Sequence, residues 1–226
     1  MQDTRSHYDA ISHWYDLLTG LGEGRARSIG LNLLRPEEGD TLLEIGCGTG
    51  QALLPLARSV GERGGVYGID LSQGMLARAQ RRIDRHEFSQ RIRLLAGDAR
   101  CQPFSSGFVD AIWISFTLEL FSPHDITRVL SECQRILASD GKLCVVALAR
   151  TANAGSMSKL YDWLHVHFPR WIDCSPISLQ ALLLQAGFIQ EEVEEISLWG
   201  LPVEIVLAHP AEMIAGPLLM ETRKEA

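Results

Sequence analysis

The sequence lacks the features that mark several classes of protein. Its 226 residues contain no long basic run, and 21 Lys and Arg against 28 Asp and Glu give a net charge of -7. Nucleic acid is therefore disfavoured as a partner, because phosphate neutralisation drives that binding. The five cysteines are odd in number and include no C-x-x-C pair, so neither a disulfide framework nor a metal site is indicated.

Long apolar runs are also missing. The strongest run covers residues 143–149, far fewer than the roughly 20 residues that a membrane-spanning helix needs. The N-terminal residues are polar and lack a secretory core. We therefore expect a cytoplasmic protein without a transmembrane segment. Peripheral contact with a membrane stays open, and the oligomeric state is not indicated.

Apolar segments of strand length alternate with segments of helical length. This alternation predicts an α/β fold with a doubly wound, mainly parallel sheet and helices on both faces. The last two strands are joined by a turn too short for a helical crossover, which predicts an antiparallel hairpin. We expect strands at 41–46, 65–70, 91–96, 108–115, 142–149, 189–198 and 203–209, and helices at 7–20, 24–34, 50–60, 72–86, 124–138, 156–168 and 176–186.

A glycine-rich turn follows the first predicted strand, in the segment Leu42-Leu43-Glu44-Ile45-Gly46-Cys47-Gly48-Thr49-Gly50. Glycine has no Cβ, so the backbone can adopt positive φ and approach a ligand closely. Asp70 ends the second predicted strand, 20 positions beyond Gly50. A carboxylate there can accept hydrogen bonds from ribose hydroxyls. The two features together predict a cofactor that contains a nucleoside.

The glycine spacing departs from the dinucleotide fingerprint. Gly46-x-Gly48-x-Gly50 replaces G-x-G-x-x-G, so the third glycine comes one position early. Glu44 lies inside the motif, where a carboxylate would repel the pyrophosphate that such turns bind. The pattern therefore favours a cationic ligand. A nicotinamide-dependent oxidoreductase is the less favoured alternative.

This segment resembles motif I of the class I S-adenosylmethionine-dependent methyltransferases. Asp70 corresponds to their motif II, and Gly97-Asp98-Ala99 matches the segment that reads adenine. The N-terminal Tyr8-Asp9-x-x-Ser12-x-x-Tyr15-Asp16 resembles the start of the ubiquinone and menaquinone C-methyltransferases, the type 11 subgroup. The resemblance covers residues 40–150 well. It implies a Rossmann-like, seven-stranded sheet whose last strand is antiparallel, and S-adenosylmethionine as cofactor.

The resemblance also implies a set of cofactor contacts. Glu44 would line the amino-acid end of the cofactor, Asp70 would hold the ribose, and Asp98 would accept a hydrogen bond from the adenine amine. Leu71 and Met75 would flank the adenine, although their i, i+4 spacing equally fits ordinary helix core. Asp98 could instead be a simple turn residue. The full set of expected cofactor residues is Tyr15, Glu44, Gly46, Cys47, Gly48, Asp70, Leu71, Met75, Asp98, Ala99 and Ser115.

The N-terminal helix is expected to cover the cofactor. An aromatic ring near a sulfonium is favoured by cation–π attraction, worth about 0.5 to 2 kcal/mol. Tyr8 or Tyr15 is therefore the candidate for a lid. The alternative is an amphipathic helix that buries Tyr8, Ile11, Tyr15 and Leu18 as core.

The methyl acceptor is expected to be small and apolar, quinone-like or lipid-like. Residues 160–174 are dense in aromatic side chains that could enclose a ring or a lipid tail. Methylation of a ring carbon requires a deprotonated ring, so Glu119, Tyr161 and His165 are the candidate catalytic groups. Glu119 could instead be a solvated or helix-capping residue. An amine or phospholipid headgroup is the alternative acceptor, and a cofactor-binding protein without catalysis also stays open.

We expect one methyltransferase domain over residues 1–226. Within it we expect an N-terminal helical lid at 1–36, a cofactor-binding core at 40–150, substrate-covering helices at 151–188 and a C-terminal hairpin at 189–209.

Overall fold

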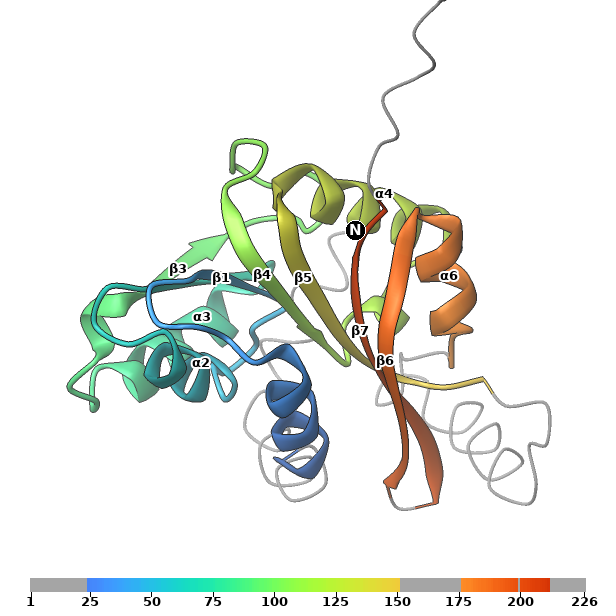
Figure 1. Ribbon diagram of the computed structural model, residues 1–226. Coiled ribbons are helices and arrows are strands. Elements are labelled where there is room, and N and C mark those ends of the chain that lie inside the picture. The colour runs from blue at the N-terminus through green and yellow to red at the C-terminus, as the bar shows by residue number, and fades with distance from the viewer. Residues whose placement is uncertain (1–23, 151–175, 199, 212–226) are drawn as a thin grey trace, which may run out of the picture.

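A computed structural model describes residues 24–150, 176–198 and 200–211 (Figure 1). Seven strands form one sheet in the order β3-β2-β1-β4-β5-β7-β6. β7 runs antiparallel to β5 and β6, and the other neighbouring pairs are parallel. The predicted fold class and the C-terminal hairpin are confirmed. The strands are β1 (Thr41–Ile45), β2 (Gly65–Asp70), β3 (Ile92–Ala96), β4 (Val109–Ser115), β5 (Leu137–Leu148), β6 (Phe188–Leu198) and β7 (Leu201–Pro210).

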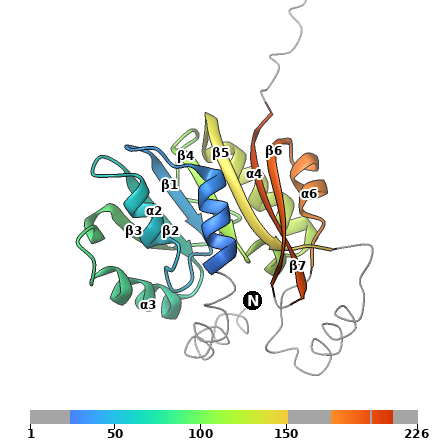
Figure 2. The same cartoon turned by 60° about the horizontal axis from the view of Figure 1, so that its bottom comes forward.

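Helices cover both faces of the sheet (Figure 2). One buried cluster joins the sheet to the helix of residues 24–34, to α2 (Leu53–Ser59) and to α3 (Gln73–Ile83). A second cluster joins the opposite face to α4 (Pro123–Ile136) and α6 (Leu179–Gln185). Two short 3₁₀ helices, η1 (Ser89–Arg91) and η2 (Leu118–Leu120), lie in the connections. Among the described residues no helix is long and apolar enough to cross a bilayer.

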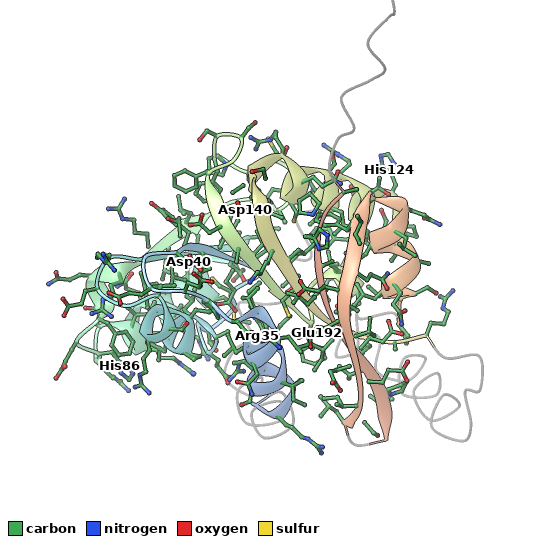
Figure 3. All side chains as sticks on the ribbon, in the orientation of Figure 1. Arg35, Asp40, His86, His124, Asp140 and Glu192 are labelled. Atoms are coloured by element: carbon green, nitrogen blue, oxygen red, sulfur yellow. The ribbon has the colours of Figure 1, made fainter. Side chains whose placement is uncertain are left out.

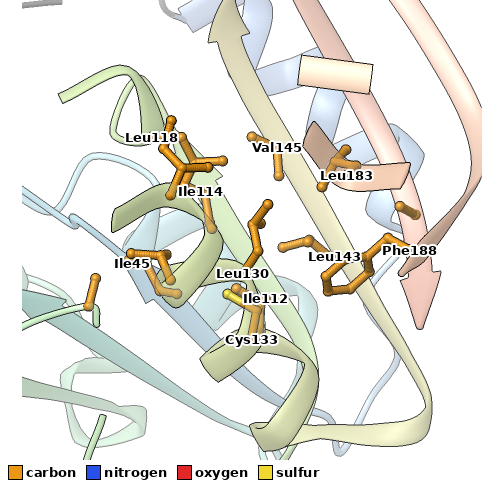
Figure 4. Packing of buried hydrophobic residues seen from close by; sticks show 14 of the residues in the cluster. Ile45, Ile112, Ile114, Leu118, Leu130, Cys133, Leu143, Val145, Leu183 and Phe188 are labelled. Carbon is orange, nitrogen blue, oxygen red and sulfur yellow. The ribbon is translucent and has the colours of Figure 1, made fainter. Parts of the chain in front are cut away.

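The amphipathic pattern of α4 explains how it packs (Figure 4). Its buried residues recur every three or four positions and face β4 and β5, where Ile112 and Leu143 are fully buried. Ser122 caps the helix by accepting a hydrogen bond from the backbone N–H of Asp125, and Pro123 occupies its first turn. The helix therefore begins just beyond the end of β4. The buried residues of α4 are Ile126, Val129, Leu130, Cys133 and Ile136.

The helix of residues 24–34 packs in the first of the two buried clusters, together with α2 and α3. A Cβ at Gly30 would meet the Trp113 ring at 2.6 Å, so glycine allows the helix to approach β4 closely. Ala26 and Leu34 are buried in the same cluster. At its end Arg35 pairs with Glu192 of β6 at 3.1 Å, and both side chains are labelled in Figure 3. This part of the predicted N-terminal lid therefore packs on the sheet, and the predicted helices at 7–20 and 156–168 lie outside the described residues.

Most predicted boundaries shift by a few residues, and three differences from the sequence prediction bear on the packing. β5 begins at Leu137, directly after α4, because buried Leu137 pairs with Val109 before a register shift. The gap between the predicted helix at 124–138 and the predicted strand at 142–149 falls inside this irregular stretch. α6 begins at Leu179 and not at 176, because Ile177 forms a bridge with Ala149. η2 occupies a segment for which no element was predicted.

The strand order places a crevice at the ends of β1 and β4. β1 lies between β2 and β4. From β1 the chain first adds β2 and β3 on one side and then crosses to add β4 and β5 on the other, so the strand order reverses there. In doubly wound sheets ligands bind outside the carboxyl ends of the strands at this switch point. The glycine-rich turn follows β1, and Ser115 ends β4, so both lie at the expected edge.

Candidate cofactor and acceptor site

The glycine-rich turn adopts the backbone conformation that its sequence predicts. Gly46, Gly48 and Gly50 have φ angles of 70, 51 and 76°, which residues other than glycine rarely adopt. A Cβ at Gly46 would also collide with the Thr117 side chain. The backbone N–H of Gly50 donates to the Cys47 carbonyl at 2.8 Å and closes the turn. The turn therefore depends on glycine for both conformation and space.

Asp70 is fixed by two backbone groups. Its Oδ2 accepts a hydrogen bond from the Gly48 N–H at 2.8 Å, and its Oδ1 accepts one from the Ser72 N–H at 2.8 Å. Ser72 in turn caps α3 by accepting from the Met75 N–H at 3.2 Å. The carboxylate is thus oriented by the glycine turn on one side and by the start of α3 on the other.

These residues surround a cavity of about 250 Å³ at the end of the sheet. Every expected cofactor residue within the described chain lines it. Leu71 is half exposed there, whereas Met75 is buried. Their contacts with a cofactor stay predictions, as does the role of Tyr15, which lies outside the described residues. The expected residues that line the cavity are Glu44, Gly46, Cys47, Gly48, Asp70, Leu71, Met75, Asp98, Ala99 and Ser115.

Glu44 is the electrostatic centre of the cavity. Its side chain is buried, and among the described residues its Oε2 has no hydrogen-bond partner. Burial raises the pKa of Glu44 well above its ordinary value; the Arg27 charge opposes this rise and the Asp70 charge adds to it. A buried carboxylate without a partner is costly. The site therefore fits a ligand that brings a cationic donor, as the ammonium group of an amino-acid cofactor does.

Arg27 is a cavity residue that the sequence does not reveal. It lies on the helix of residues 24–34, and its Nη2 donates to Gln51 Oε1 at 3.0 Å. Both side chains line the cavity beside the glycine turn. No motif marks Arg27, because its place depends on how a separate helix packs across the sheet.

Arg100 is a second residue that sequence reasoning missed. Its guanidinium reaches Asp98 with the Nη2–Oδ2 pair at 2.7 Å and Asp125 with the Nη1–Oδ1 pair at 3.1 Å. The hydrogen bond from the Arg100 side chain is the main reason that the pKa of Asp98 is lowered. Asp98 is therefore held as a charged carboxylate at the cavity wall.

Another part of the cavity lining is mainly apolar. It is built by Phe116, Thr117, Leu120 and Phe121, which follow β4. Phe116 has a φ of 49°, and a bulky residue with positive φ is a backbone outlier of the kind found at functional sites. The Thr117 hydroxyl donates to the Ser115 carbonyl at 2.9 Å and shapes this turn.

Glu119 takes a different place from the one expected. The sequence suggests an ionisable group at the opening of the active site, whereas the side chain is 2% exposed and is absent from the cavity lining. Its Oε1 accepts a hydrogen bond from the Leu148 N–H at 3.2 Å, which ties η2 to the end of β5. The solvated alternative is therefore wrong, and a catalytic role for Glu119 stays a prediction. Tyr161, His165 and the aromatic stretch at 160–174 lie outside the described residues.

The fold and cavity define an α/β protein that binds a nucleoside cofactor at its switch point, and comparisons with known proteins agree. Residues 42–141 match a family model described as a methyltransferase domain. The demethylmenaquinone methyltransferase of Lactobacillus johnsonii is 33% identical over 65% of this chain and 58% of its own length. The 2-phytyl-1,4-naphtoquinone methyltransferase of Trichormus variabilis is 30% identical over 67% of each. The chain thus spans less than two thirds of the Lactobacillus relative.

A solved structure supports the fold. The S-adenosylmethionine-dependent methyltransferase from Aquifex aeolicus superposes with a TM-score of 0.63 at 22% identity, covering 80% of this chain and 88% of that one. The chain belongs to the class I S-adenosylmethionine-dependent methyltransferases. The cofactor of that family is S-adenosylmethionine, and the buried Glu44 carboxylate, whose Oε2 has no hydrogen-bond partner among the described residues, suits its amino-acid end.

Proposed function

We propose that this chain transfers the methyl group of S-adenosylmethionine to a small, apolar, quinone-like acceptor. The observation that carries the proposal is the contrast inside one cavity. Three carboxylates, on Glu44, Asp70 and Asp98, contribute one part of the lining, and the apolar side chains that follow β4 contribute another. The first part suits a cationic nucleoside, and the second suits a ring with an apolar tail. The names of the Lactobacillus and Trichormus relatives support this choice of acceptor.

The cofactor, when bound, supplies an electrophilic methyl carbon on a sulfonium. The chain's own residues then act by position. Glu44 receives the cofactor ammonium, and Asp70 accepts from the ribose hydroxyls. Holding two reactants in line contributes about 7 to 11 kcal/mol in well-oriented model reactions. No covalent enzyme intermediate is required.

Methylation of a ring carbon also moves a proton. A C–C bond forms as the sulfur–methyl bond breaks, and the proton on the same ring carbon must leave. The ionisable side chains of the described lining all precede β4 in the chain, and residues 115–121 contribute none. We therefore assign removal of this proton to Tyr161 or His165 in preference to Glu119, which accepts a hydrogen bond from the β5 backbone.

We place the protein in the cytoplasm, in peripheral contact with the membrane that holds an apolar acceptor. The support is indirect. Four cysteines of the described chain are free, as a reducing compartment favours. An acceptor with a long apolar tail partitions into the bilayer, so the enzyme must meet it at the surface.

The test has two stages. Calorimetry compares binding of S-adenosylhomocysteine with binding of NAD, and we expect only the first to bind. The protein is then incubated with methyl-labelled S-adenosylmethionine and either a reduced, short-chain naphthoquinone or phosphoethanolamine. Label in a new methyl group on a ring carbon of the naphthoquinol is expected. Tighter binding of NAD, or label only in the amine, contradicts the proposal.

A further inference from the structure

The hydrogen-bond acceptor positions of the Asp98 carboxylate are already occupied by a neighbouring residue. The backbone N–H and the Nε of Arg100 reach Oδ1 at 2.9 and 3.0 Å, and Nε and Nη2 reach Oδ2 at 3.2 and 2.7 Å. A carboxylate offers about four acceptor positions. A single residue therefore occupies the positions that the adenine amine would need.

Arg100 also has a second anchor. Its Nη1 lies 3.1 Å from Asp125 Oδ1, in the first turn of α4. Asp125 is itself fixed by the Ser122 hydroxyl, which donates to Oδ2 at 3.0 Å. The guanidinium thus spans two carboxylates from different elements. The three side chains are 22 to 36% exposed, so the guanidinium can move between them without opening the core.

We propose that Arg100 determines how strongly the site selects the adenine base, by competing with the adenine amine for Asp98. When the amine binds, the side-chain contacts of Arg100 leave Asp98, and Asp125 retains the guanidinium. The backbone N–H of Arg100 stays on Oδ1. This inference rests on the proposed function, because it requires an adenine-containing cofactor in the cavity.

The competition has a measurable consequence. In the native protein each hydrogen bond that the amine gains replaces one that Arg100 loses, so the amine adds little to affinity. Removing the guanidinium frees Asp98 for the amine, and affinity rises. Removing the Asp125 charge leaves Asp98 as the sole carboxylate in contact with the guanidinium in the described residues, and affinity falls.

A purely structural role for Arg100 gives another result. If the residue only braced the loop after β3 against α4, Arg100→Met and Asp125→Asn would both weaken the site. The direction of the two effects therefore separates competition from bracing. The preference for a ligand with the adenine amine over one without it is a second way to distinguish competition from bracing.

The experiment is a calorimetric cycle. The ligands are S-adenosylhomocysteine and the matching compound whose purine lacks the 6-amino group. In the native protein we expect the two to differ by less than about threefold. In R100M we expect S-adenosylhomocysteine to bind about 3- to 10-fold tighter and the missing amine to cost about tenfold or more, as a hydrogen bond to a charged group does. D125N is expected to bind about threefold more weakly than the native protein.

Two further variants serve as controls. Arg128 lies 3.8 Å from Asp125 and acts on Asp98 through its charge, so R128M removes a neighbouring charge without freeing Asp98 and is expected to keep the native preference for the amine. R100K keeps the positive charge but lacks the planar guanidinium that contacts both Asp98 oxygens. Its affinity for S-adenosylhomocysteine is expected to lie between those of the native protein and R100M, which preserves the test if R100M folds poorly. Weaker binding by both R100M and R100K, or an unchanged preference for the amine, overturns the inference. Absence of S-adenosylhomocysteine binding by the native protein overturns the proposed function itself.

Discussion

The two sides of the cavity solve different physical problems. On the cofactor side, Glu44 and Asp70 lie at the ends of neighbouring strands, and Asp70 is oriented by backbone N–H groups. On the acceptor side, Phe116, Leu120 and Phe121 present apolar surface from one short connection after β4. In the proposed function, charge holds the cofactor, and an apolar surface that excludes water binds the acceptor. Mutations should therefore separate cofactor binding from acceptor binding.

The largest effect is expected from Gly46→Ala on the cofactor side. The new Cβ would meet Thr117, and φ would stay positive, so we expect a loss of about 2 to 5 kcal/mol of unfolding free energy and no measurable binding of S-adenosylhomocysteine. Gly107 also has positive φ, but open space surrounds it. Gly107→Ala should cost about 1 to 2 kcal/mol with normal binding. Thermal unfolding and calorimetry measure both; equal effects of the two substitutions would contradict the account.

Glu44→Gln should weaken cofactor binding next most. The substitution removes the charge that receives the ammonium group, and we expect S-adenosylhomocysteine affinity to fall about 10- to 100-fold. Glu204 is a matched control, because burial also raises its pKa while its carboxylate contacts Gln180, away from the cavity. Glu204→Gln should bind normally. A similar loss in both variants would show that the charge acts at long range and not by contact.

The same variant should change how stability depends on pH. The pKa of Glu44 is raised in the folded protein, so the folded state holds a proton that the unfolded chain releases near pH 4.3, its approximate ordinary value. Stability of the ligand-free protein therefore falls as pH rises from there to the folded pKa. Glu44→Gln should remove this decrease and stabilise the ligand-free protein at neutral pH. Chemical denaturation across pH measures it, and an unchanged slope would contradict the assignment.

A smaller effect is expected on the acceptor side. Leu120 is 40% exposed at the cavity wall, so Leu120→Asn should fold normally. It should raise the KM for a reduced naphthoquinone about tenfold, through lost apolar contact, while S-adenosylhomocysteine affinity stays unchanged. Leu184 on α6 is more exposed and lies off the cavity. Leu184→Asn should leave steady-state kinetics unaltered; a fall in cofactor affinity in Leu120→Asn would break the division between the two sides.

The smallest effect is expected from charges remote from the cavity. Arg35 and Glu192 form an exposed ion pair at 3.1 Å, and such pairs contribute about 0 to 1 kcal/mol. Arg35→Met should therefore change the unfolding free energy by less than about 1 kcal/mol and leave S-adenosylhomocysteine binding intact. A clear change in binding would show that net charge, and not placement at the strand ends, governs the site.

The contrast also explains which parts of the site were predictable. The cofactor side follows from local sequence, because Gly46 and Gly48 act through backbone conformation and Asp70 comes at a strand end. Ser72 caps α3 at the residue where the sequence predicts that helix to begin. Arg27 and Arg100 were not predicted, because their partners are set by the packing of separate elements.

The acceptor side was less predictable for a related reason. The sequence marks Glu119 as an ionisable group beyond β4, yet the 3₁₀ turn of η2 directs its carboxylate to the Leu148 backbone. The early start of β5 likewise depends on the pairing of Leu137 with Val109, a contact between strands that no local pattern reveals.

The central claim is that buried Glu44 receives a positively charged group of the cofactor. A calorimetric titration with S-adenosylhomocysteine, repeated at mildly acidic pH in two buffers of different ionisation enthalpy, tests it most directly. Because the arriving ammonium favours the ionised carboxylate, the account predicts that binding releases a proton in the native protein and none in Glu44→Gln. Equal proton release in both proteins, or none in the native protein at any pH, would contradict it.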